Sequence, residues 1–268
     1  MGYLDGKVAI VTGAGRLRGI GRATAVALAS EGADIVVTGT GRDPAALPDH
    51  EKQAGWKDVE STAQQVRERG RRALTWVGDV SRAASVDELV DRVMAAFGRI
   101  DVLVNNAAYP RGNDRVPLTQ LDEAVWHKVL EIKLTGAFLL CKRIVPIMTR
   151  QKWGRIVNLS SVAGKRGAPN TAAYNVANFG IQGLTQSLAM EVARQGVTVN
   201  AICPGIIDTA RMDVLGRGAG WQDLVERIPM GRAATDEEVS GLIAFLCSPS
   251  ATYMTGQSIN IDGGMVMW

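Results

Sequence analysis

The sequence contains few of the residues that build metal sites or disulfide frameworks. Two histidines and three cysteines occur among its 268 residues. The histidines, His50 and His127, lack the i,i+4 spacing of a zinc-binding helix, and the cysteines include no Cys-x-x-Cys pair. We therefore expect no metal site, and we expect the cysteines to be reduced and buried as small apolar residues.

Long uncharged apolar runs are also missing. No segment approaches the ~18 residues that a membrane span requires, and the first residues, Met1 to Lys7, lack the apolar stretch of a signal peptide. The 30 basic and 27 acidic side chains give a net charge of only +3. This small excess argues against nucleic acid and membrane surfaces as partners. A folded cytoplasmic protein is the expectation.

What the sequence does contain is a regular alternation of short β-branched runs with longer helical segments. The runs are continuously apolar, which is typical of strands buried on both faces of a parallel sheet. We predict an α/β fold of Rossmann type, a doubly wound seven-stranded parallel sheet with helices on both faces. The predicted strands are 8–11, 35–38, 73–77, 102–104, 155–159, 197–202 and 258–261, and the first predicted helix is 20–30.

Two segments interrupt this alternation. Residues 41–57 form a polar insertion after the second predicted strand, and residues from about 206 to 232 follow the sixth. Both are expected at the carboxyl ends of strands, where ligands bind in open α/β sheets. No linker or repeat divides the chain, so we expect one domain over 1–268, with 206–232 as its substrate loop.

A glycine-rich turn at residues 12–21 follows the first predicted strand and opens the first helix. It reads Thr-Gly-Ala-Gly-Arg-Leu-Arg-Gly-Ile-Gly. Glycines permit a tight turn and close backbone approach, while the helix start offers free N–H groups and the positive end of its dipole. The expected ligand is a pyrophosphate, although a tight structural turn gives the same residues.

Taken with the features that follow, this turn resembles that of the short-chain dehydrogenase/reductase family, in its compact single-domain type. The family's Thr-Gly-x-x-x-Gly-x-Gly is matched at Thr12, Gly13, Gly19 and Gly21, with two extra residues. Further similar segments occur in family order: Asp79-Val80, Asn105-Asn106-Ala107-Ala108, Pro204 to Thr209 and Asp262-Gly263-Gly264.

The resemblance covers nearly the whole chain and implies a nicotinamide dinucleotide site, a small-molecule substrate and a homotetramer or homodimer. The cofactor-binding residues that it implies, with the arginines discussed next, are Gly13, Arg16, Arg18, Gly19, Ile20, Gly21, Thr40, Arg42, Asp79, Val80, Asn106, Ala107, Tyr174, Pro204, Gly205, Ile207 and Thr209.

The end of the second predicted strand bears on the choice between NADP and NAD. Enzymes that prefer NAD usually have an acid there, whereas residues 38–42 read Thr-Gly-Thr-Gly-Arg. Arg18 and Arg42 are therefore expected to pair with a 2′-phosphate, unless both are solvated surface charges. We predict NADP as the cofactor, and Asp43 keeps NAD as the alternative.

The resemblance also implies a catalytic pair, and here the sequence departs from the family. Ser161 precedes Tyr174 by thirteen residues, a spacing at which the family's serine binds the substrate oxygen and its tyrosine transfers the proton. The family's lysine four residues after the tyrosine is replaced by Asn178, and Lys133 stands where the family has an asparagine. The two residue types therefore look exchanged, giving the catalytic set Ser161, Tyr174, Lys133 and Asn178.

Three interpretations of this exchange are open. Lys133 restores the ammonium from a facing helix, or both changes adapt the site to an imine or amine, or catalysis is lost and Lys133 is a solvated charge. Because Ile132 and Leu134 flank Lys133, burying it unpaired would be costly, which favours a retained purpose. We predict hydride transfer between NADP(H) and a carbonyl/alcohol pair, with an imine reductase and a non-catalytic nucleotide-binding scaffold as alternatives.

Arginines cluster in the segments expected near the substrate. Arg211, Arg217 and Arg232 belong to the predicted substrate loop, and Arg111 and Arg115 follow the Asn105-Asn106 pair. These arginines either receive an anionic substrate or are solvated charges.

Overall fold

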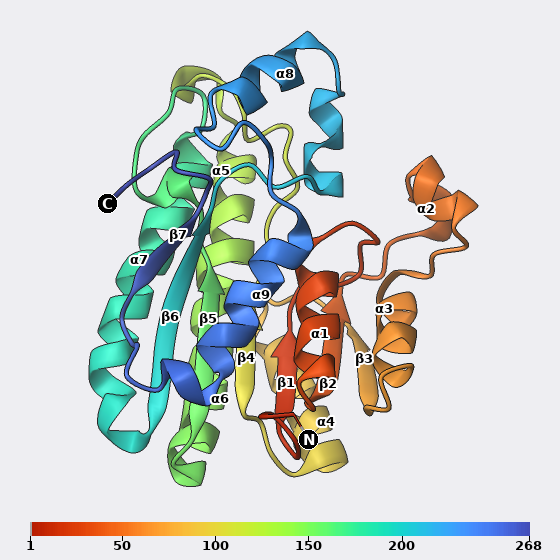
Figure 1. The fold of residues 1–268 in the computed structure, drawn as a ribbon, viewed down its shortest axis with the longest axis vertical. Helices are drawn as coiled ribbons and strands as arrows, with labels where there is room; N and C mark the ends of the chain where they lie inside the picture. Colours follow the sequence, from red (N-terminus) through yellow and green to blue (C-terminus); the bar gives the residue numbers. More distant parts are fainter. Residues whose placement is uncertain (1) are drawn as a thin grey trace.

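Seven parallel strands form the centre of the molecule (Figure 1). The computed structural model describes residues 2–268 and orders the strands β3-β2-β1-β4-β5-β6-β7. The predicted fold class is confirmed, and no strand end differs from its predicted position by more than two residues. The strands are β1 Val8–Val11, β2 Asp34–Gly39, β3 Ala73–Val77, β4 Val102–Asn105, β5 Gly154–Leu159, β6 Val197–Pro204 and β7 Ser258–Ile261.

Helices cover both faces of this sheet because the central strands β1 and β4 are apolar on both sides. In β1, Ala9 and Val11 face one core, and Val8 and Ile10 face the other. The first core lies under α1 Ile20–Ser30, α3 Asp58–Arg67 and α9 Asp236–Cys247. The second lies under α4 Ala83–Phe97, α6 Gly136–Gln151 and α7 Ala172–Val192.

The segments that interrupt the alternation fold into short helices toward the upper end of the view in Figure 1. The 41–57 insertion contains α2 Asp49–Gln53, and 206–232 contains α8 Ala219–Glu226. The remaining elements are α5 Glu123–Leu130, a π-helical turn at Glu131–Thr135, and 3₁₀ turns at Pro44–Ala46, Leu118–Gln120, Val162–Gly164, Ala193–Gln195, Ala210–Leu215 and Pro249–Ala251.

Within residues 2–268, no helix combines the length and apolar character needed to cross a membrane. The three cysteines, Cys141, Cys203 and Cys247, are unpaired and buried, as predicted. Burial raises the pKa of both the Cys141 and Cys247 thiols to about 12.

Candidate active site

A cavity of about 790 Å³ lies at the carboxyl edge of the sheet. It extends from the glycine-rich turn across the ends of β2, β3 and β4 to the start of the 206–232 segment. Of the predicted cofactor residues, Tyr174, Pro204, Gly205 and Ile207 do not line it. Those that do are Gly13, Arg16, Arg18, Gly19, Ile20, Gly21, Thr40, Arg42, Asp79, Val80, Asn106, Ala107 and Thr209.

The glycine-rich turn has the geometry that a pyrophosphate requires. Gly13 adopts a positive φ of 66°, and a Cβ on Gly21 would lie 2.6 Å from the Gly13 carbonyl oxygen. Helix α1 begins without a side-chain cap and without an acidic residue in its first turn, so its leading N–H groups and positive dipole end face the cavity. These residues therefore fit a nicotinamide dinucleotide.

Two side chains from distant elements hold this turn in place. The Asn106 amide donates to the Thr12 carbonyl (2.7 Å) and to the Gly13 carbonyl (3.0 Å), so it positions the turn from the end of β4. The Asp236 carboxylate accepts the Gly19 N–H at 2.7 Å from the first turn of α9. The role of Asp236 was not predicted, because no local pattern reveals that α9 packs beside α1.

The two extra residues of the turn are accommodated by the 41–57 insertion. The Leu17 N–H donates to the Glu51 carboxylate at 2.9 Å, and the Trp56 indole donates to the Gly15 carbonyl at 2.7 Å. Glu51 is fully buried. The 41–57 insertion is therefore an ordered segment that lines part of the cavity.

Arg42 is neither free nor solvated. Its guanidinium contacts Glu51 at 2.6 Å and Asp58 at 3.0 Å, and it donates to the Gly15 carbonyl at 2.8 Å. A 2′-phosphate would therefore compete with two carboxylates for this side chain. An acid does lie beside the end of β2, but it comes from the start of α3. The Asp58 carboxylate is 3.6 Å from a Cβ placed on Gly39.

Asp43, which kept NAD as an alternative, turns away from this position. Its carboxylate accepts the Ala45 N–H at 2.8 Å and caps a short 3₁₀ turn.

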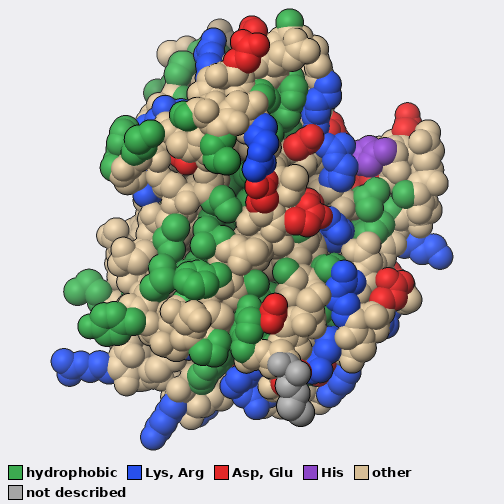
Figure 2. Space-filling view, in the orientation of Figure 1, with side chains coloured by type: hydrophobic (Ala, Val, Ile, Leu, Met, Phe, Trp, Pro, Cys, Tyr) green, Lys and Arg blue, Asp and Glu red, His purple; other side chains and the backbone are tan. Residues whose placement is uncertain are grey.

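Arg18 is likewise engaged. Its guanidinium contacts Asp208 at 2.8 Å and Asp213 at 3.1 Å, and Arg217 contacts the same two acids. Figure 2 shows acidic and basic side chains intermingled in the upper half of this face. The network ties the glycine-rich turn to the 206–232 segment.

Arg16 differs from its two neighbours. It lines the cavity, and no carboxylate of the described residues lies within ion-pair distance of it. Burial and then the Arg42 guanidinium lower its pKa. Arg16 is thus the cation of the turn that remains available for a phosphate.

Ser161 and Tyr174 lie on adjoining elements at the ends of β5 and the start of α7. The Ser161 hydroxyl accepts the Ala163 N–H at 3.2 Å and lies 3.5 Å from the Pro204 carbonyl at the end of β6. The 3₁₀ turn that follows packs on α7, where the Ser160 hydroxyl donates to the Asn178 carbonyl at 3.0 Å. This packing brings the segment after β5, which carries Ser161, against the helix that carries Tyr174, although neither residue lines the 790 Å³ cavity.

Lys133 lies in the π-helical turn between α5 and α6, and its side chain points inward. It is only 7% exposed, so its interpretation as a solvated charge is wrong. Within the part of the chain that the structure describes, its amine has no hydrogen-bond or ion-pair partner. Burial, followed by the Arg211 guanidinium, lowers the pKa of Lys133 to about 7. π-helical turns of this kind often mark functional sites.

Asn178 occupies the position of the missing lysine and is fully buried. Its amide donates to the Tyr174 backbone carbonyl at 2.8 Å, whereas its Oδ1 has no hydrogen-bond partner among residues 2–268. No direct hydrogen bond joins Asn178 to Lys133 in these described residues. The exchange of roles between the two therefore stays a prediction.

The buried amine leads to a prediction about stability. Between about pH 7 and 10.5 the unfolded chain keeps Lys133 protonated while the native state releases the proton. Stability therefore rises with pH across this window, and the native state bears a penalty of up to about 4 kcal/mol at neutral pH. We expect Lys133→Met to unfold at higher urea concentration than the parent at pH 7, with a smaller difference at pH 9. Equal pH dependence of the two proteins would contradict this expectation.

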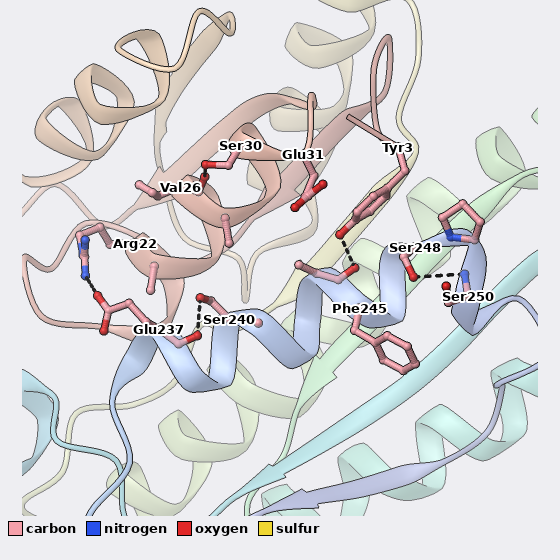
Figure 3. Close-up of a pocket in the computed structure, with 15 residues that line it drawn as sticks. Tyr3, Arg22, Val26, Ser30, Glu31, Glu237, Ser240, Phe245, Ser248 and Ser250 are labelled. Carbon is pink, nitrogen blue, oxygen red and sulfur yellow. Dashed lines mark hydrogen bonds and ion pairs between the residues drawn. The ribbon is translucent and has the colours of Figure 1, made fainter. Parts of the chain in front are cut away.

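A second cavity, of about 700 Å³, is an open groove between α1 and α9 (Figure 3). Two of its polar side chains are already partnered: the Tyr3 hydroxyl donates to the Ala244 carbonyl at 2.9 Å, and Arg22 contacts Glu237 at 2.8 Å. None of the predicted catalytic residues lines this groove. In residues 2–268, moreover, no three His, Cys, Asp or Glu side chains gather in a metal-binding arrangement.

Comparisons with known proteins identify the family. A family model described as enoyl-(acyl carrier protein) reductase matches residues 13–266. A 3-oxoacyl-[acyl-carrier-protein] reductase of Synechocystis is 39% identical over the full length of both chains.

Solved structures are similar over nearly the whole chain. A putative short-chain dehydrogenase/reductase from Burkholderia xenovorans has a TM-score of 0.87 at 35% identity, covering 99% of this chain and 98% of the other. A putative gluconate dehydrogenase from Agrobacterium tumefaciens has a TM-score of 0.86 at 33% identity, covering 98% of each.

The chain is thus similar over nearly its whole length to a 3-oxoacyl-[acyl-carrier-protein] reductase and to solved dehydrogenase structures. The cofactor is a nicotinamide dinucleotide, NADP with NAD as the alternative. The chain belongs to the short-chain dehydrogenase/reductase family and is an oxidoreductase of carbonyl/alcohol pairs.

Proposed function

We propose that the protein is an NADP(H)-dependent reductase in which Tyr174 donates the proton, Ser161 binds the substrate oxygen and Lys133 stabilises the phenolate that remains. The observation that carries this proposal is the buried Lys133 side chain in the π-helical turn that packs against α7, whose amine has no hydrogen-bond or ion-pair partner among residues 2–268. Burying an amine without a partner is costly, so its presence in the core indicates that the site uses it.

Each residue has a defined task in the reduction. When bound in the cavity, the dinucleotide supplies the hydride. The Ser161 hydroxyl donates a hydrogen bond to the substrate oxygen, and the Tyr174 hydroxyl transfers its proton to that oxygen. The Lys133 ammonium then faces a negative charge on the phenol. Asn178, whose Oδ1 has no partner in the described residues, is the proposed acceptor for this ammonium.

The proposed substrate is a ketone or its alcohol. The names of the relatives support this class, because they specify a 3-oxoacyl group and gluconate, a hydroxy acid. The experiment is to supply NADPH with ketones, diketones and cyclic imines. Oxidation of NADPH by ketones supports the proposal, turnover of imines alone favours the imine reductase, and NADPH binding without any turnover favours the scaffold.

The proposed assembly is a homotetramer or homodimer of single-domain chains in which 206–232 covers the substrate. Large apolar side chains on α6 and α7 support an interface there, since Phe138, Val176 and Phe179 are 46%, 46% and 47% exposed. The reduced, buried cysteines are in keeping with the cytoplasm, which is the proposed compartment.

The preference for NADP is proposed to rest on Arg16. We expect Arg16→Ala to weaken NADPH binding about 10- to 100-fold and NADH binding little, because a charge-assisted hydrogen bond to a phosphate contributes about 1.5–3 kcal/mol. Arg42→Ala is the matched comparison. It should weaken both cofactors similarly, since Arg42 holds Glu51, Asp58 and Gly15 in place.

Dissociation constants from cofactor fluorescence test this assignment. If Arg42→Ala selectively lost NADPH binding and Arg16→Ala did not, the residue that binds the 2′-phosphate would be Arg42 and not Arg16.

A further inference from the structure

Positive charge is concentrated around the Tyr174 ring. The Arg115 guanidinium lies 3.9 Å from the ring centroid, and the Arg211 guanidinium lies 5.5 Å from it. The buried amine of Lys133 is close enough to Arg211 for the two charges to repel. Arg111 lines the adjoining cavity and is close enough to Arg115 to affect it. Two guanidinium groups therefore lie against the ring of the proposed proton donor, and Lys133 and Arg111 add positive charge next to them.

Fewer acidic than basic side chains lie in this region. In the described residues, Asp114 is the one carboxylate within ion-pair distance of any of the four, with its Oδ2 3.3 Å from Arg115 Nη1. Its other oxygen accepts the Gly112 N–H at 3.1 Å. Arg211 donates to the backbone carbonyl of Tyr109 and has no acidic partner. The site therefore has an excess of positive charge at the point where the substrate binds.

Arg115 is the cation that is best placed to bind a substrate group. Its side chain is only 13% exposed, and among residues 2–268 its Nε and Nη1 make no hydrogen bond, although Nη1 lies within ion-pair distance of Asp114. A planar guanidinium with unsatisfied donors matches the two oxygens of a carboxylate. Stacking on the Tyr174 ring fixes this fork beside the phenol.

We propose that the substrate is an anion: a ketone or secondary alcohol whose carboxylate lies a few bonds from the reacting carbon and is bound by Arg115, with Arg211 as the second cation. This inference rests on the proposed function and names its substrate class. A 3-oxoacyl thioester, by contrast, carries no charge near its reacting carbon. Binding such a neutral group would leave the Arg115 donors unpaired when water is excluded, which is unfavourable.

The experiment uses matched acids and methyl esters with the oxo group at three distances: pyruvate, acetoacetate and levulinate, each against its ester. Initial rates of NADPH oxidation give kcat/KM for each member. We expect at least one acid to exceed its ester about 10-fold or more. Arg115→Gln should lower kcat/KM for that acid about 10- to 100-fold more than for its ester, and leave NADPH affinity unchanged.

Two further variants make the result specific. Arg72→Gln is the matched control, because the Arg72 guanidinium also stacks on an aromatic ring, 4.2 Å from the centroid of Phe97, but directly precedes β3, at the amino end of the sheet and away from Tyr174. It should behave as the parent. Arg115→Lys keeps the charge beside Asp114 but loses the fork, so it should retain part of the preference for the acid. If Arg115→Gln does not fold, the Arg115→Lys variant still tests whether the guanidinium fork binds the carboxylate.

Binding separates this inference from the proposed function. The acids and esters are titrated into the complex with NADP⁺, which cannot reduce them, and heat is measured by calorimetry. Arg115-dependent binding of an acid supports the inference even where no compound is turned over, a result that would count against the proposed function alone. Esters that react and bind as well as the acids, or a preference for acids that survives Arg115→Gln, would overturn it.

Discussion

Tyr174→Phe is expected to lower kcat for ketone reduction about 10²- to 10⁴-fold, the range that general acid catalysis contributes. The substitution removes only the hydroxyl that gives the proton. The ring remains beneath the Arg115 and Arg211 guanidinium groups, so the local packing is kept. NADPH affinity should therefore be unchanged, because Tyr174 does not line the dinucleotide cavity. Initial rates at saturating NADPH, with cofactor fluorescence for binding, measure both quantities.

Tyr109→Phe provides the control for this prediction. Tyr109 lies in the loop after β4, and its backbone carbonyl, not its hydroxyl, accepts the Arg211 guanidinium. We expect this variant to retain most of the parental kcat. Loss of activity in Tyr109→Phe together with retention in Tyr174→Phe would assign the proton to the other phenol.

Local patterns in the sequence were sufficient to predict the sheet. A continuous apolar run such as Val8–Val11 has one stable place, buried on both faces of a parallel sheet, and the helix Ile20–Ser30 has the bounds predicted from its composition. The glycine-rich turn was predictable because its position between a strand and a helix determines where its N–H groups point.

Side-chain partners from distant segments were not predictable in this way. Arg42 has the residue type and position expected of a phosphate ligand, but Glu51 and Asp58 engage it from an insertion whose fold no periodicity reveals. The arginines predicted near the substrate also fall into two groups, those paired with acids and those that face Tyr174. Arg217 contacts acids on its own loop and Arg232 contacts Glu238, while Arg211 and Arg115 face Tyr174.

Lys133 is the intermediate case. Its apolar neighbours in sequence indicated that burial would be costly, and the side chain is indeed buried. Its π-helical backbone had no signal in the sequence. Burial lowers the pKa of Lys133 to about 7, so the neutral amine becomes accessible near neutral pH. An anion bound nearby favours the charged form, so a carboxylate substrate would itself supply protonated Lys133 to the reaction.

Lys133→Ala is expected to lower kcat about 10²- to 10³-fold. If the ammonium approaches the developing phenolate to about 4 Å in the reacting complex, it contributes roughly 4 kcal/mol at an effective dielectric constant of about 20, and a difference of about 1.4 kcal/mol corresponds to tenfold in rate. In the parent, kcat/KM should fall as pH rises through about 7, because the free enzyme loses the ammonium there. The alanine variant should lack this decline.

The double variant Lys133→Asn with Asn178→Lys tests whether position or charge matters. Both sites are buried and belong to elements that pack together, η3 at Glu131–Thr135 and α7, so an ammonium at 178 enters the same corner from the opposite helix. We expect it to recover activity over Lys133→Asn alone, because the charge is restored while the amide moves to position 133. Activity of Lys133→Ala equal to the parent between about pH 6 and 9 would show that the reaction does not use this amine. Loss in both single and double variants would mean that the amine must approach from the π-helical turn, where its burial already sets its pKa near neutrality.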